Sequence, residues 1–136
     1  MNRRSWLVLA TFPLLYPVMG CQAQSSLPEE YLGQWYFSGS SGGMDGNGTG
    51  EPAVGWIVIT DDNEIEHYRD DGSLAVTTRF DLTRAQSIYT GQEAWALSES
   101  GGMQRVIALY ENGTMAISDN VYDGYSSGYQ RTPLTR

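Results

Sequence analysis

The chain has 136 residues, 40% hydrophobic and 18% charged, which is typical of one globular domain and excludes fibrous and wholly disordered classes. All sixteen acidic residues follow position 21, together with six of the eight arginines, so this part carries a formal charge of −10 and we expect no nucleic-acid partner. One histidine and one cysteine exclude the usual zinc cluster and an internal disulfide, and we predict no metal and no cofactor.

The first twenty residues have the composition of an export signal. Arg3 and Arg4 form a short basic region, and an apolar stretch follows from Trp6 to about Met19. Pro13 and Pro17 interrupt this stretch, which is shorter than the roughly 20 apolar residues that a spanning helix needs. Residues 1–20 are therefore predicted to be a signal peptide.

The end of this signal resembles the lipobox of bacterial lipoproteins. A hydrophobic residue, Val18, lies three positions before Cys21, and the small residue Gly20 directly precedes it. The resemblance implies that Cys21 is acylated after cleavage and anchors the protein in a membrane, because two or more acyl chains give stable anchoring. Gln22, in place of an aspartate after the cysteine, resembles an outer-membrane sorting signal. We expect an envelope protein on the outer membrane, facing the periplasm or the surface.

Residues 21–29 are predicted to be a polar, lipidated tether, and residues 30–136 the folded domain. Short runs rich in Val, Ile, Thr, Tyr and Trp alternate there with Gly, Asp and Asn clusters, and no window keeps helical spacing over ten residues. The runs predict strands at Leu32–Ser38, Val54–Thr60, Glu64–Arg69, Leu74–Asp81, Gln86–Thr90, Ala94–Ser98, Gln104–Tyr110, Thr114–Ser118 and Gly128–Thr132.

Tight turns between these strands indicate antiparallel neighbours. Four short segments each separate two runs and tolerate the backbone conformations of hairpins: Asp61-Asp62-Asn63, Asp70-Asp71-Gly72, Gly101-Gly102 and Asn112-Gly113. Eight or nine such strands can form a sandwich or close into a barrel. Closure removes exposed edges, so we predict an all-β fold, a small antiparallel up-and-down β-barrel of eight to nine strands.

Two short motifs resemble those of lipocalins. Gly33 and Trp35 lie in a G-x-W pattern on the first predicted strand, and Arg131 lies on the last one, where lipocalins place an arginine across the tryptophan. With Tyr68–Gly72 and Ser118–Asn120, these motifs are similar to small lipocalin-like lipoproteins of bacteria. The resemblance implies that Gly33, Trp35 and Arg131 close the barrel. The chain is shorter than a full lipocalin and shows no C-terminal helix. These differences leave undecided whether the barrel contains a large ligand cavity.

The glycine-rich segment Gly39–Gly50 lies between the first two predicted strands. It is either a solvated connection or, by resemblance to lipocalins, a loop over the barrel mouth in which Met44 is the bulky residue. Its Asp45 and Asn47 have the spacing that begins a calcium loop, but Trp56 stands where the bidentate glutamate is needed, so we expect no calcium site.

Catalysis is not expected. His67 shares a strand face with Ile65 and Arg69, no Gly-x-Ser-x-Gly elbow is present, and carboxylates gather at turns rather than in apolar runs. We therefore predict that the chain is not an enzyme.

The aromatic residues carry the remaining functional signal. Strand alternation places Phe37 on the same side as Trp35, and Trp56, Phe80 and Trp95 are further candidates for the interior and for ligand contact. An eight-stranded barrel is either filled by its own side chains or holds one small ligand. Two hypotheses follow: binding of a small hydrophobic molecule at the barrel mouth, or a solid barrel whose outer face or loops engage another envelope protein.

Overall fold

The computed structural model describes residues 26–43 and 50–135, and these form an eight-stranded antiparallel barrel. Cys21, Met44, Asp45 and Asn47 lie outside the described residues. A short 3₁₀ helix precedes the strands. The elements in chain order are η1 (Glu29–Tyr31), β1 (Gly33–Gly42), β2 (Trp56–Ile59), β3 (Glu64–Tyr68), β4 (Leu74–Gln86), β5 (Glu93–Glu99), β6 (Gln104–Leu109), β7 (Met115–Asp119) and β8 (Tyr125–Gln130).

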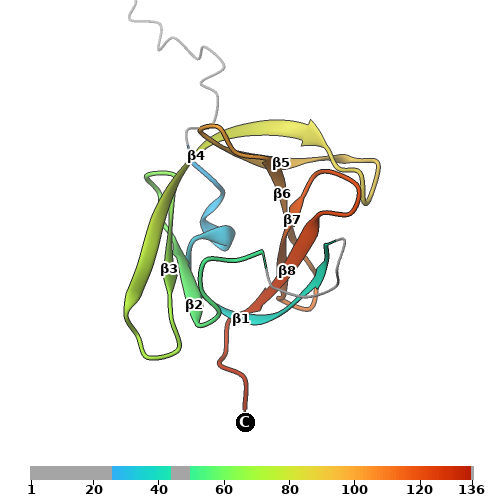
Figure 1. Ribbon diagram of the computed structural model, residues 1–136. Coiled ribbons are helices and arrows are strands. Elements are labelled where there is room, and N and C mark those ends of the chain that lie inside the picture. Colours follow the sequence, from blue (N-terminus) through green and yellow to red (C-terminus); the bar gives the residue numbers. More distant parts are fainter. Residues whose placement is uncertain (1–25, 44–49, 136) are drawn as a thin grey trace, which may run out of the picture.

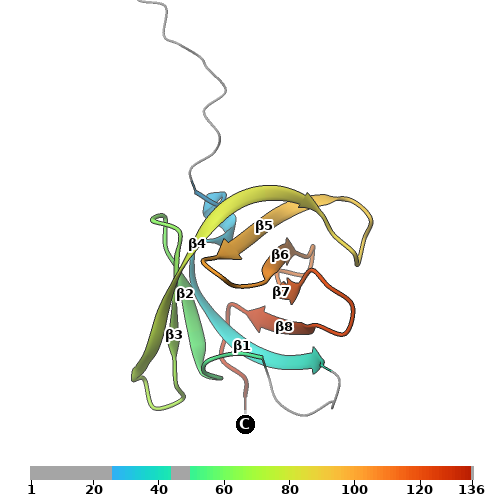
Figure 2. The same cartoon turned by 45° about the horizontal axis from the view of Figure 1, so that its top comes forward.

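Each strand pairs with its neighbours in sequence, and β1 pairs with β8 to close the sheet (Figures 1 and 2). β1 serves two partners. Its first half pairs with β2, ending at the pair Tyr36 and Trp56, and its second half pairs with β8 from Tyr36 to Gly42. The β1–β8 register shifts between Phe37 and Gly39, which marks a bulge where the strand turns from one partner to the other. The predicted up-and-down barrel is confirmed.

The predicted hairpin turns are confirmed by the backbone. Asn63, Gly72, Gly101 and Gly113 all have positive φ angles, between 58° and 88°, in the four turns that the sequence singled out. Gly42, at the end of β1, is a position where only glycine fits. Its φ is +97°, and a Cβ atom there would lie 2.1 Å from the carbonyl oxygen of Gly124.

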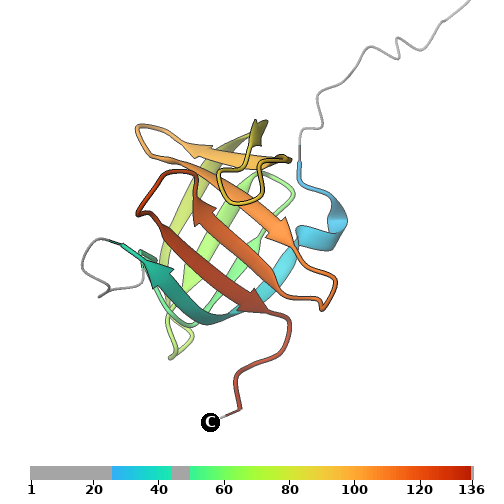
Figure 3. The same ribbon diagram turned by 90° about the vertical axis from the view of Figure 1, so that its right-hand side faces the viewer.

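The predicted strand Gln86–Thr90 is wrong, because β4 continues to Gln86 and residues 87–92 form a turn. The backbone N–H of Ile88 donates to Asn120 Oδ1 at 2.9 Å, and the hydroxyl of Tyr89 donates to the carbonyl of Asp119 at 2.7 Å. This turn lies across the wall of the barrel in Figure 3. Ala96 and Val106, which pair across β5 and β6 and alternate with the inward-facing Leu97 and Ile107, are also buried.

The barrel interior is filled by large apolar side chains. Alternate residues of every strand point inward and form one buried cluster, in which each side chain is at most 3% exposed. An interior of this kind is stabilised by roughly 1.5–3 kcal/mol for each fully buried large side chain. The cluster comprises Leu27, Trp35, Ile57, Ile59, Ile65, Phe80, Leu97, Ile107, Met115, Ile117 and Tyr129.

The two ends of the domain meet at Trp35. The Arg131 guanidinium carbon lies 3.6 Å from the centre of the indole ring, and the indole Nε1 donates to the Tyr31 carbonyl of η1 at 2.9 Å. Arg131 also donates to the carbonyls of Gln34 and Glu30, at 3.0 and 2.9 Å. The contact with the ring adds about 0.5–1 kcal/mol at such an exposed position. Leu27 packs in the same core, so the folded part extends beyond the predicted boundary at residue 30.

Trp35→Ala is expected to lower the free energy of unfolding by about 3–5 kcal/mol, because it empties a large buried site. Urea titration followed by circular dichroism measures this loss. Tyr122→Ala is the control, since Tyr122 is 88% exposed and its replacement should change the free energy by about 0.5 kcal/mol or less. A loss below about 1 kcal/mol for Trp35→Ala would contradict its place in the core.

Candidate functional site

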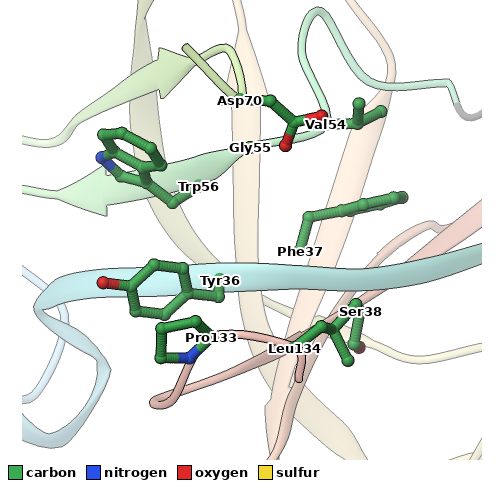
Figure 4. A pocket seen from close by; sticks show the side chains of 9 residues that line it. All are labelled: Tyr36, Phe37, Ser38, Val54, Gly55, Trp56, Asp70, Pro133 and Leu134. Atoms are coloured by element: carbon green, nitrogen blue, oxygen red, sulfur yellow. The ribbon is translucent and has the colours of Figure 1, made fainter. Parts of the chain in front are cut away.

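A groove opens in the barrel wall where β1 leaves β2 (Figure 4). Beyond the last strand pair, the N–H of Phe37 donates to the Gly55 carbonyl at 3.1 Å, and β1 then follows β8 alone. The separation leaves a hollow of about 470 Å³ between β1, the segment before β2 and the C-terminal tail. Its lining consists of Tyr36, Phe37, Ser38, Val54, Gly55, Trp56, Asp70, Pro133 and Leu134.

The groove is lined by aromatic and aliphatic side chains together with polar groups, and its polar and apolar surfaces are nearly equal. Figure 4 shows Trp56 and Tyr36 on one side, with Asp70 and Ser38 placed at opposite edges. Val54 and Leu134 are 42% and 55% exposed, so apolar surface is open to solvent along the groove. Cavities of about 300–1,000 Å³ with apolar walls and a few polar groups are the usual form of small-molecule sites.

Three aromatic rings continue the groove across the outer face of the sheet. Trp56 stacks on Tyr68, with ring centres 5.4 Å apart and planes 13° apart, and it meets Tyr36 at 6.2 Å. These residues are cross-strand partners on β1, β2 and β3 and alternate with the buried Trp35, Ile57 and His67. Trp56 therefore faces outward, and its predicted place in the interior is wrong. The apolar run of β2 gave no alternation from which to choose the buried face.

The four predicted ligand residues do not surround one cavity. Phe37 and Trp56 line the groove, and Phe37 also meets the Tyr129 ring edge-on at 5.9 Å. Phe80 is buried in the core. Trp95 lies beneath the Arg84 guanidinium, 4.4 Å from the ring centre, and lines a separate hollow of about 330 Å³ beside Tyr31.

A charged cluster lies inside the barrel, formed by side chains that the sequence did not bring together. The segment before β2 crosses the opening of the barrel in Figure 1 and carries Glu51. The Glu51 side chain is fully buried, and one of its oxygens accepts a hydrogen bond from Arg105 Nη2. Its other oxygen lies 3.9 Å from His67 Nδ1. Arg105 Nε lies 3.6 Å from an Asp119 oxygen. Nothing in the sequence around Glu51, a glycine and a proline, signals its burial.

Burial governs the titration of this cluster. It lowers the pKa of His67, and the Arg105 charge lowers it further, while the Glu51 carboxylate opposes both. His67 is thus neutral at neutral pH. Burial also raises the pKa of Tyr129 far above its usual range, and the Glu51 charge adds to this effect. Burial alone would lower the pKa of Arg105, but the Glu51 carboxylate raises it, so Arg105 stays charged.

The chain has no match among protein-family models, curated proteins or solved structures. Within residues 26–43 and 50–135, no group of three or more His, Cys, Asp and Glu side chains is placed to hold a metal ion. In the same part of the chain, no helix has the length and apolar character needed to cross a membrane. The resemblance to lipocalin-like lipoproteins stays a prediction.

The free energy of unfolding is expected to fall as the pH drops below about 6.5. The folded state holds His67 with a lowered pKa, so the unfolded chain takes up the proton first and acid favours unfolding. Denaturant titrations at pH 8 and pH 5 measure the loss, with His67→Gln as the control for all other groups. An equal pH dependence in both proteins would contradict the burial of a neutral His67.

Proposed function

We propose that this chain is a lipid-anchored protein of the bacterial envelope whose barrel is a rigid binding module. The Val18–Cys21 motif supports the anchor, and the burial of Leu27 supports a short tether. Leu27 lies six positions after Cys21, which limits the distance between the lipid and the barrel to about 20 Å. The barrel would therefore work at the membrane surface, on the outer membrane if Gln22 acts as the sorting residue.

The proposed ligand is a small hydrophobic or aromatic molecule, and the proposed site is the groove of Figure 4. This proposal rests on the contrast between a barrel core filled by its own side chains and an open groove between β1 and β2 that has aromatic and polar walls. Trp56 and Tyr36 supply flat apolar surface, and Asp70 and Ser38 supply polar groups at the margin. The proposed ligand would therefore lie in the barrel wall rather than in the barrel centre.

A second candidate is a protein partner in the envelope. The aromatic row of Tyr36, Trp56 and Tyr68 extends the groove over the outer face of β1–β3, and aromatic residues are enriched at protein interfaces. In this case the groove would receive a side chain of the partner. The filled interior is compatible with both candidates.

Binding is proposed rather than catalysis. A catalytic triad would need a nucleophile, a base and an orienting acid, and Thr78, His67 and Glu51 lie in this order. Thr78 Oγ1 is 3.4 Å from His67 Nε2, and His67 Nδ1 is 3.9 Å from a Glu51 oxygen. The second distance is too long for a hydrogen bond, and Arg105 holds the Glu51 carboxylate. Burial also lowers the pKa of His67, which weakens it as a base.

Trp56→Ala is expected to weaken binding of the neutral fluorescent probe N-phenyl-1-naphthylamine by about tenfold or more, since the indole forms one wall of the groove. Fluorescence titration of the full chain in mild detergent measures the affinity. Trp95→Phe, which changes the separate hollow, should leave it unchanged.

Native mass spectrometry of the full chain, purified gently from its source, then separates the two candidates. A small bound mass that Trp56→Ala loses supports the ligand. A protein that binds the wild-type chain and not Trp56→Ala supports the partner. The groove would be rejected as a binding site if Trp56→Ala and wild type bound the probe with equal affinity and the mass spectra showed neither a bound small molecule nor a bound protein.

Cys21→Ala is expected to abolish incorporation of labelled palmitate and to release the protein from the membrane fraction, because Cys21 is the single cysteine. Metabolic labelling and membrane fractionation measure both effects. Ser25→Ala is the control and should keep the label. Unchanged labelling of Cys21→Ala would contradict the anchor.

A further inference from the structure

The charged cluster inside the barrel has the chemistry of a carboxylate receptor. The Glu51 side chain is 0% exposed, and its two oxygens face Arg105 and His67. The Tyr129 hydroxyl is buried in the same interior, and burial followed by the Glu51 charge raises the pKa of Tyr129. Arginine, histidine and tyrosine all offer N–H or O–H donors, which are the groups that bind a carboxylate. A carboxylate from a loop therefore occupies a pocket made by the barrel.

The pocket has more donors than Glu51 uses. His67 is 2% exposed, and its Nδ1, which is a donor in the tautomer whose Nε2 accepts from Thr78 Oγ1, makes no hydrogen bond within the described part of the chain. The Nε of Arg105 is likewise buried without a hydrogen bond to any described residue. Buried donors without acceptors cost free energy, and in native proteins they usually have a further partner. Glu51 and Asp119 therefore satisfy these groups incompletely, at 3.9 Å from His67 Nδ1 and 3.6 Å from Arg105 Nε.

A hollow of about 200 Å³ adjoins the same side chains. It is lined by His67, Thr78 and Arg105, with Gly50, Pro52, Glu99, Met103 and Asp119 around them. One water occupies about 30 Å³ of liquid, so the hollow has room for a molecule of a few heavy atoms. The space lies beside the groups that hold Glu51 and connects them to the surface.

The charges of the site decide how an anion could enter. Arg105 is the cation that faces the hollow, and Glu51 and Asp119 already balance it. Glu99 adds a further acidic side chain to the lining. A second carboxylate beside Glu51 would meet repulsion in a poorly solvated site. An external carboxylate is therefore accommodated only where it replaces the Glu51 side chain.

From this geometry we infer that the barrel interior is a binding site for small monocarboxylates, which Glu51 fills as an internal ligand. The external ligand has the size of acetate or propionate, because it takes the place of the Glu side chain beyond Cα. Its carboxylate binds Arg105 and His67, and its methyl or ethyl group lies where the Glu51 methylenes lie. The site shares no residue with the groove, so the inference goes beyond the proposed function and can fail without it.

The test is chemical rescue of Glu51→Ala in the full chain, held in mild detergent at pH 7. Removing the carboxylate leaves Arg105 buried with only Asp119, so the thermal midpoint should fall by several degrees. Sodium acetate at ten times its dissociation constant should then raise the midpoint by about 6 °C over sodium chloride of equal ionic strength. Acetamide, which has the shape of acetate and no charge, should have little effect. Wild type should respond equally to both salts.

The double variant Glu51→Ala/Arg105→Met supplies the matched control. It removes both charges of the pair, so acetate should no longer raise its midpoint above that in chloride. An equal response of Glu51→Ala to acetate and chloride would overturn the inference, and so would a rescue that persists in the double variant. In the second case acetate acts elsewhere on the protein.

Glu51→Gln provides a second test of acetate binding if Glu51→Ala does not fold in either salt. The amide keeps the shape of Glu51, but without the charge it binds Arg105 more weakly than a carboxylate does, so acetate can displace it. Carbon-13 acetate should show line broadening with Glu51→Gln and at least tenfold less with wild type, where the native carboxylate competes. No broadening with Glu51→Gln, or equal broadening with wild type, would overturn the inference.

Discussion

The pairing of β1 with β8 is the constraint on which the rest of this structure depends. Without it the sheet would have two edges, and the alternate apolar residues of eight strands would have no common interior. Arg131 and Trp35 secure this seam from outside and inside, since the guanidinium at the end of β8 covers the indole on β1. Closure also fixes which face of every strand is buried. This alternation of inward and outward residues determines on which side of the barrel each functional side chain lies.

Closure has opposite consequences for the two candidate sites. The interior is narrow enough for its own side chains to fill most of it, so apolar ligand contact moves to the wall, where β1 must leave β2 to reach β8. The groove is thus a product of closure. The same narrow interior surrounds Glu51, Arg105 and His67 with low-dielectric walls, which shift the pKa of His67 downward and strengthen the ion pair between Glu51 and Arg105.

Features governed by local chemistry could be predicted from the sequence. Turn pairs such as Asn112-Gly113 gave the hairpins, and strand alternation placed Phe37 on the side of Trp35. Features that depend on distant partners could not. β4 runs through Gln86 because β5 pairs along its whole length, and Trp56 faces outward because Ile57 and Ile59 occupy the interior. Glu51 gave no signal, since its burial depends on Arg105, which lies 54 positions later in the chain.

Hydrogen exchange of the backbone amides, followed by nuclear magnetic resonance, tests the closed barrel most directly. In a closed barrel the amides that bond between β1 and β8, around Phe37 and Tyr129, should exchange as slowly as those between β5 and β6. The reason is that both sets of hydrogen bonds open only with global unfolding. Fast exchange confined to the β1–β8 seam, with the other strand pairs protected, would show an open sheet with two edges and contradict the account.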